Sequence, residues 1–156
     1  TPLEARLAIA AGAQVLCLVH NVLASDSLED LGTDIAVAGI GVLARSPLAY
    51  GLLAGAFSLD QTFTDDDHRS RRWDKETLNR RLAAVAQLGF LVHGAVRTPS
   101  EAAIRWVLAN SHVTSCIVGA RSPAQAASAA AASVGAPYLP EDELARIPQV
   151  LAALGL

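Results

Sequence analysis

The hydrophobic residues of this chain occur in two kinds of run. Residues 15–19, 40–44 and 115–118 are short, mostly apolar runs, and uninterrupted runs of this length are typical of strands buried on both faces of a parallel sheet. Between them, aliphatic residues recur at three- and four-residue spacing, which predicts helices with one apolar face. The alternation indicates an α/β fold of three parallel strands joined by crossover helices.

The starts of the predicted helices are marked by capping residues. Residues 1–4 combine a capping hydroxyl, a proline in the first turn and a glutamate three residues after the cap. The other predicted caps are Asp26 or Ser27, Asp74, Thr98 and Ser122. A last helix starts at Pro140, and we expect Pro148 to kink or shorten it, because proline removes a backbone donor and crowds the preceding turn. The predicted core faces carry Leu28, Leu31 and Ile35, then Leu78, Leu82, Val85 and Leu88, and then Ile104, Val107 and Leu108.

Three parallel strands alone make an incomplete sheet. Both outer strands would present unpaired backbone groups at their free edges. We therefore expect additional strands, from another segment or another chain, to complete it.

Length and composition fit one soluble domain. The chain has 156 residues, 52% of them hydrophobic, and its net charge of −3 with scattered basic residues argues against a nucleic-acid partner. No apolar run reaches the roughly 18 to 20 residues that cross a membrane, and the first residues lack the basic, apolar and small-residue order of a secretory signal, so we expect a cytoplasmic protein. Cys17 and Cys116 lie in apolar runs and are expected to be inert packing residues.

The residues that follow each strand are the candidates for chemistry, because ligands of parallel α/β folds bind at the carboxyl ends of the strands. They are residues 20–21, 45–46 and 119–121. In the last group, a turn of small residues leads through Arg121 to a helix capped by Ser122, and the free amides of a helix N-terminus suit a phosphate. The alternative is an ordinary turn with a solvated arginine.

Several segments in one register resemble bacterial aldo-keto reductases. Residues 42–55 (Val-Leu-Ala-Arg-Ser-Pro-Leu-Ala-Tyr-Gly-Leu-Leu-Ala-Gly) are similar to the family's penultimate strand and to the Ser-Pro-Leu turn that leads into Gly-Leu-Leu-Thr-Gly. Residues 66–70 resemble the loop that follows, residues 103–108 the family's Ala-Leu-Arg-Trp-Val-Leu helix, and residues 117–125 its Ile-Pro-Gly-Ala-Arg phosphate loop. The match runs across nearly the whole chain, so we expect family membership.

The resemblance implies that the three strands are the last three of a (β/α)8 TIM barrel, a half barrel with NADP(H) lying across their carboxyl ends. Arg45 takes the place of the family's stacking aromatic residue, and Ser46 and Leu48 would line the pyrophosphate. The adenosine phosphate would be bound by Gly119, Ala120 and Arg121. The adenine would lie beside Gln125 and Ser128.

The chain departs from the family pattern at several cofactor positions. Cys17 stands where a glutamine usually holds the nicotinamide amide, His20 where a tyrosine is common, and Ser128 where an asparagine contacts the adenine. The family's catalytic tetrad of aspartate, tyrosine, lysine and histidine comes from the first half of the barrel. The chain's only lysine and tyrosines are Lys75, Tyr50 and Tyr138. No catalytic residue is therefore expected here.

Two other groups of side chains suggest different chemistry. Residues 65–68 (Asp-Asp-Asp-His) could bind a divalent cation, but consecutive residues in an expected exposed loop converge poorly on one ion. His20, followed by Asn21 at a strand end, could take part in acid–base chemistry. No nucleophile lies beside it in the sequence.

Two functions remain open from the sequence. In the first, the chain is the NADP(H)-binding half of an oxidoreductase that interconverts carbonyls and alcohols, completed by a missing N-terminal half barrel and acting on a small carbonyl substrate. The absence of a starting methionine favours it. In the second, the chain is a self-associated or partnered half barrel that serves as a binding or scaffold protein, or supports a cofactor-independent reaction. The residues at positions 17, 20 and 128 favour the second.

Overall fold

Three parallel strands form one open sheet in the order β1-β2-β3. In this computed structural model, which describes residues 1–156, the strands are β1 (Val15–Val19), β2 (Gly41–Arg45) and β3 (Ser115–Ile117). The predicted α/β class with three parallel strands and crossover helices is therefore confirmed. Relative to the prediction, β2 is shifted by one residue and β3 ends one residue earlier.

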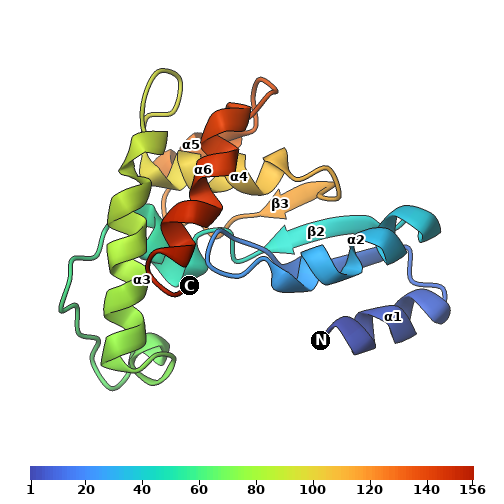
Figure 1. Cartoon of the computed structure of the whole chain (residues 1–156), viewed down its shortest axis with the longest axis horizontal. Helices are drawn as coiled ribbons and strands as arrows, with labels where there is room; N and C mark the ends of the chain where they lie inside the picture. Colours follow the sequence, from blue (N-terminus) through green and yellow to red (C-terminus); the bar gives the residue numbers. More distant parts are fainter.

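Helices of two kinds connect and flank the strands. The α-helices are α1 (Pro2–Ala10), α2 (Asp26–Ala38), α3 (Lys75–Gln87), α4 (Pro99–Ala109), α5 (Pro123–Ala132) and α6 (Glu141–Ala152). The 3-10 helices are η1 (Ala49–Ala54), η2 (His68–Arg71) and η3 (Leu88–Leu91). Figure 1 shows α1 at one end of the molecule and α3 with α6 at the other. None of these helices is both long enough and apolar enough to pass through a membrane.

Most helix starts follow the predicted capping chemistry. The side chains of Thr1, Asp74, Thr98 and Ser122 each accept a hydrogen bond from the backbone N–H three residues later. At α2 the prediction of Asp26 or Ser27 is wrong, because the N-cap is Ser25, which makes no side-chain cap bond. Asp26 lies in the first turn, where its carboxylate interacts favourably with the positive end of the helix dipole. The predicted shortening at Pro148 is also wrong, since α6 continues past this proline to Ala152.

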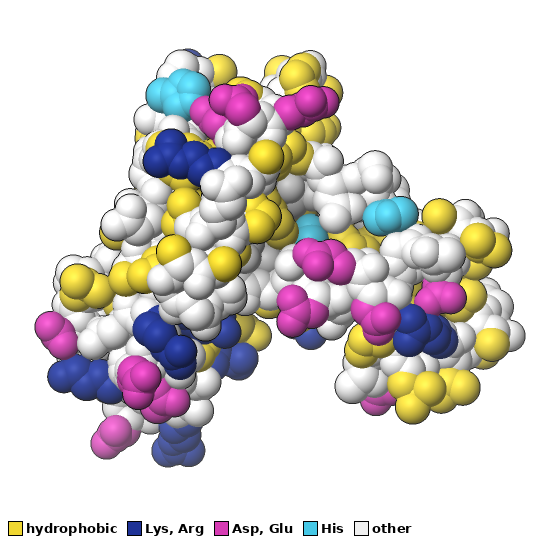
Figure 2. Space-filling view, in the orientation of Figure 1, with side chains coloured by type: hydrophobic (Ala, Val, Ile, Leu, Met, Phe, Trp, Pro, Cys, Tyr) yellow, Lys and Arg dark blue, Asp and Glu magenta, His cyan; other side chains and the backbone are white.

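The core consists of two clusters of buried side chains. One lies among α1, α2 and the sheet and contains Ala5, Leu16, Leu28, Leu31, Ile35 and Val42. The larger cluster joins η1, α3, η3, α4 and α6, and its members include Leu52, Leu78, Leu82, Leu91, Ala103 and Ile147. In Figure 2 the molecule shows two lobes with a hollow between them. The predicted apolar faces of α2 and α3 therefore lie in different parts of the core.

One face of the sheet is exposed, so the prediction that every strand is buried on both faces is wrong. Leu16 and Val42 face the helices and are buried, whereas Val15 is 53% exposed and Ile117 is 48% exposed. The helices of this chain cover only one side of the sheet, so an apolar run does not receive burial on both sides. Cys17 is exposed on β1 as well and is not the buried packing residue that we predicted.

The polar segment before α3 is packed around Arg69, although Asp65, Asp66 and His68 within it are exposed as predicted. The Arg69 guanidinium carbon lies 5.1 Å from the ring centroid of Phe57 and 4.6 Å from that of Phe63. Arg69 also forms an ion pair with Asp67, and the hydrogen bonds from Arg69 lower the pKa of Asp67 to about 2. Asp67 thus serves to hold this segment together.

Leu28→Ala is expected to destabilise the protein by about 2–5 kcal/mol, because Leu28 is fully buried and its truncation leaves a cavity. Val37→Ala is the matched control on the same helix. Val37 is 85% exposed, so its truncation should change stability by no more than about 0.5 kcal/mol. Urea denaturation measures both variants, and an equal loss of stability in the two would contradict the buried face assigned to α2.

Candidate functional site

The carboxyl ends of the three strands lie side by side at one edge of the sheet. The strand register aligns Val19, Arg45 and Ile117. Beyond this row, the backbone N–H of His20 donates to the Arg45 carbonyl at 3.2 Å. The side-chain amide of Asn21 donates to the Ser46 carbonyl at 3.0 Å. These bonds fix the segments after β1 and β2 to one another.

The turn after β2 has a strained backbone. Ser46, Ala49 and Tyr50 have φ values of 57°, 46° and 60°, in the left-handed region that disfavours residues with a side chain by roughly 1–2 kcal/mol each. Hydrogen bonds hold the turn in place, with the Ala49 N–H donating to the Ser46 carbonyl at 3.0 Å and the Leu53 N–H to the Leu48 carbonyl at 3.2 Å. Strain of this kind clusters at ligand-binding sites.

The loop between β3 and α5 offers backbone donors that have no partner. The N–H groups of Gly119, Ala120 and Ser122 make no hydrogen bond within the chain. A Cβ added at Gly119 would meet no atom within 4 Å, so a ligand could approach the backbone there. The Arg121 side chain is exposed, and α5 directs the positive end of its dipole at the loop. Together these donors and charges fit a phosphate.

Gln125 and Ser128, the two predicted neighbours of the adenine, have hydrogen-bond partners inside the chain. The Gln125 Oε1 accepts from the Arg121 backbone N–H at 2.8 Å. The Ser128 hydroxyl donates to Glu101 Oε1 at 3.2 Å. Gln125 therefore braces the loop from its own helix, and Ser128 ties α5 to α4.

The predicted site residues come from the ends of β2 and β3. Arg45 is exposed at the last position of β2, and the strained turn that follows holds Ser46 and Leu48. The remaining predicted residues lie after β3 and in α5: Gly119, Ala120, Arg121, Gln125 and Ser128. Their contact with a cofactor stays a prediction.

His20 has a buried environment that the sequence did not reveal. The residue is 1% exposed, its ring stacks on Trp106 with centroids 4.8 Å apart, and neither ring nitrogen has a hydrogen-bond partner. Burial lowers the pKa of His20 from 6.5 to about 4, against a smaller opposing effect of the Glu29 charge. The imidazole is therefore neutral near pH 7.

Tyr50 and Lys75 have different interaction partners within the chain. The Lys75 Nζ lies 3.5 Å from the Asp60 carboxylate, and both side chains are largely exposed. Tyr50 instead packs under the Arg72 guanidinium, whose carbon lies 3.7 Å from the ring centroid. Within the chain there is also no group of three or more His, Cys, Asp and Glu side chains arranged to hold a metal ion.

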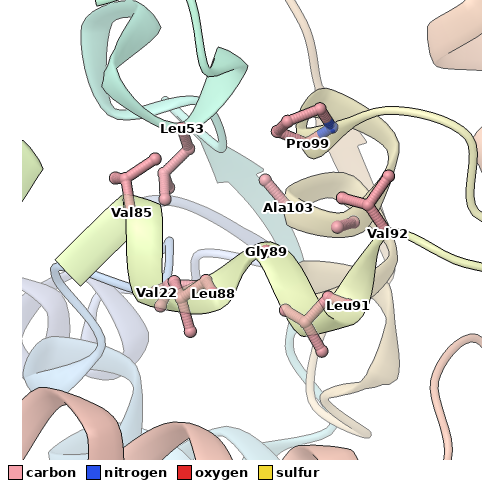
Figure 3. A pocket seen from close by; sticks show the side chains of 10 residues that line it. Val22, Leu53, Val85, Leu88, Gly89, Leu91, Val92, Pro99 and Ala103 are labelled. Carbon is pink, nitrogen blue, oxygen red and sulfur yellow. The ribbon is translucent and has the colours of Figure 1, made fainter. Parts of the chain in front are cut away.

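An apolar cavity of about 30 Å³ lies within the larger core cluster. Figure 3 shows Leu53, Val85 and Ala103 around this space, on η1, α3 and α4. A space of this size holds about one water molecule. The cavity is thus a small packing defect, and the strand ends remain the candidate site.

Comparisons with known proteins agree with the sequence resemblance. The family model described as "Aldo/keto reductase family" matches residues 11–152. A Schizosaccharomyces pombe protein named as a voltage-gated potassium channel subunit beta is 30% identical over 115 residues, which are 68% of this chain and 33% of that protein.

Two solved structures share the fold. The glycerol dehydrogenase of Gluconobacter oxydans is 28% identical with a TM-score of 0.79, and the match covers 89% of this chain and 42% of that one. The holo form of an aldo-keto reductase from Bacillus halodurans has a TM-score of 0.67 at 19% identity, covering 96% and 46%. The second likeness concerns the fold alone. The chain spans less than half the length of each of these relatives.

The buried His20 predicts a loss of stability in mild acid. Because its pKa is lower in the folded state than the ordinary 6.5, the unfolded state binds a proton that the folded state does not. The contribution of the neutral His20 to the free energy of unfolding is fully present well above pH 6.5. It falls by about 3 kcal/mol as the pH drops to 4. His20→Phe keeps an aromatic ring against Trp106 and should remove this part of the pH dependence.

Urea denaturation between pH 7 and pH 4 measures the effect as the difference between wild type and His20→Phe. His68→Gln, a change at an exposed histidine, is the control and should follow the wild-type curve. Parallel curves for wild type and His20→Phe would contradict the buried neutral imidazole.

Proposed function

The chain belongs to the aldo/keto reductase family, and we propose that it is the NADP(H)-binding half of such an oxidoreductase barrel. The observation that carries the proposal is the set of three unpartnered amides beside the exposed Arg121, at the carboxyl end of a parallel sheet. Enzymes with this type of sheet bind ligands at that end.

The proposed contacts with the cofactor come from the ends of two strands, β2 and β3. Gly119, Ala120 and Ser122 would donate backbone N–H groups to the phosphate on the adenosine ribose, and Arg121 would pair with it. Ser46 and Leu48 would line the pyrophosphate, and Arg45, in the place of the family's stacking aromatic residue, would add a second positive charge at the end of β2. When bound, NADP(H) supplies or accepts the hydride that interconverts a carbonyl and an alcohol.

The exposed face of the sheet supports the second part of the proposal, which concerns completion of the barrel. Val15, Cys17 and Ile117 present an apolar surface that water covers in this chain alone, and β1 and β3 each have a free edge. A barrel removes both exposures, because its strands pair in a ring and their inner faces pack together. We propose that an N-terminal half barrel fills this role and brings the catalytic residues and the small carbonyl substrate.

The second candidate is a half barrel that binds a partner without a cofactor. The internal bonds of Gln125 and Ser128 favour it, because these side chains are already occupied where adenine contacts are expected. A titration with NADPH separates the two, since only the first candidate binds the dinucleotide.

Arg121→Ala is expected to weaken NADPH binding about 10- to 100-fold, because a charge-assisted contact to phosphate is lost. The measurement is the change in NADPH fluorescence or the heat of binding at fixed ionic strength. Arg71→Ala, at an exposed arginine of η2, is the matched control and should leave the affinity unchanged. If both variants bind NADPH equally well, the phosphate site is assigned to the wrong loop.

The chain alone is expected to show no carbonyl reduction with NADPH, since the proposed catalytic groups lie in the other half barrel. Adding the N-terminal half of a family member, by co-expression, should restore NADPH oxidation. Loss of NADPH absorbance in the presence of an aldehyde follows the reaction. Turnover by the chain alone would contradict this division of roles.

A further inference from the structure

Helix α4 carries two buried charged residues that do not pair with each other. Glu101 and Arg105 are each 9% exposed, and neither forms an ion pair in the chain. Glu101 Oε1 accepts from the Ser128 hydroxyl at 3.2 Å, and its Oε2 accepts from the Arg97 N–H at 2.7 Å. A buried carboxylate without a cation is unfavourable unless such hydrogen bonds compensate it.

These charges hold α5 against α4. Ser128, the partner of Glu101, lies in the middle of α5, and Arg105 donates to the carbonyls of Val134 at 3.3 Å and Tyr138 at 3.2 Å, just after α5 ends. Apolar packing contributes little there, because the helix is alanine-rich and Ala132 is its only buried residue. The position of α5 therefore depends on polar bonds to α4.

Hydrogen bonds connect the first turn of α5 to the loop that precedes it. One turn before Ser128, Gln125 accepts from the Arg121 N–H through its side chain and donates its own N–H to the Ser122 hydroxyl at 3.2 Å. The loop with the unpartnered amides is thus bonded to the first turn of α5. A shift of this turn would move the amides with it.

We propose that Glu101 is a positioning residue that aligns the loop of residues 119–122 for a phosphate by holding Ser128. This role rests on the proposed NADP(H) function, because the phosphate is the one on the adenosine ribose. Glu101 acts through Ser128, since Glu101 itself lies on α4 and makes no hydrogen bond to the loop. What it positions are the backbone N–H donors of the loop.

Three variants test the role. Ser128→Ala removes the bond between the helices, and Glu101→Leu removes both acceptors. Glu101→Gln can keep both bonds, because its carbonyl oxygen accepts from Arg97 and its amide group donates to the Ser128 oxygen. The matched control is Ile104→Val, which loosens the core side of the same helix at a residue that is 3% exposed.

Two kinds of measurement, hydrogen exchange and cofactor binding, are made on each variant. Hydrogen exchange of residues 119–125 in the protein without cofactor is expected to be about fivefold faster in Ser128→Ala and Glu101→Leu than in wild type. The Kd for NADPH should rise about fivefold in the same two variants. The Kd for NADH should change less than about twofold, since NADH lacks the ribose phosphate. Glu101→Gln and Ile104→Val should resemble wild type in all three quantities.

The outcomes separate this role from the proposed function. If wild type binds NADPH and Ser128→Ala behaves like Ile104→Val in both measurements, Glu101 has no positioning role although the cofactor site stands. Faster exchange with an unchanged preference for NADPH over NADH would also overturn it. A wild-type protein that binds no NADPH overturns the proposed function, and the phosphate role of Glu101 falls with it, whatever the exchange rates show.

Discussion

The parallel register of β1, β2 and β3 places the residues that follow these strands in a single row. Because every strand runs in the same direction, Arg45 and the loop before α5 meet at the carboxyl edge of the sheet. The crossover helices cover one face only, which leaves Val15 and Ile117 exposed on the other. The parallel register thus sets the shared carboxyl edge, and the placement of the helices on one side leaves the other face of the sheet apolar and exposed.

The two sides of the site are held by different segments of the chain. The turn after β2 has a strained backbone that local hydrogen bonds hold in place, together with the bond from the Asn21 side chain to the Ser46 carbonyl. The loop after β3 is fixed by hydrogen bonds from α5, a helix with little apolar packing of its own. The bonds between Gln125 and the loop are exposed, so the loop depends on the position of α5, whose partly buried polar bonds to α4 are sensitive to the loss of a single partner.

Much of the fold could be predicted from the sequence because its determinants are local. Three apolar runs gave the strands within one residue, and the caps at Asp74, Thr98 and Ser122 needed only residues three positions apart. The burial of the strands was not local, because the covering of each face depends on which helices cross it. The run that includes Cys17 therefore predicted two-sided burial that this chain does not provide.

The site could be predicted only in part for the same reason. The residues after each strand follow from chain direction, so Arg45 and Arg121 could be placed at the carboxyl ends of β2 and β3. The stacking of His20 on Trp106 and the bond between Glu101 and Ser128 join distant segments, and no spacing in the sequence indicates them. The tie between Ser128 and α4 also gives that residue a structural partner beyond the adenine contact that the resemblance implied.

An NMR titration of the backbone amides with NADPH tests directly whether the loop after β3 binds a phosphate. A phosphate held by the loop after β3 predicts the largest chemical-shift changes at Gly119, Ala120 and Ser122, whose N–H groups have no partner in the chain. The amides of α1 should remain unchanged. Shifts that are absent from this loop, or that gather at α1 and α2, would contradict the assignment of the strand ends as a phosphate site.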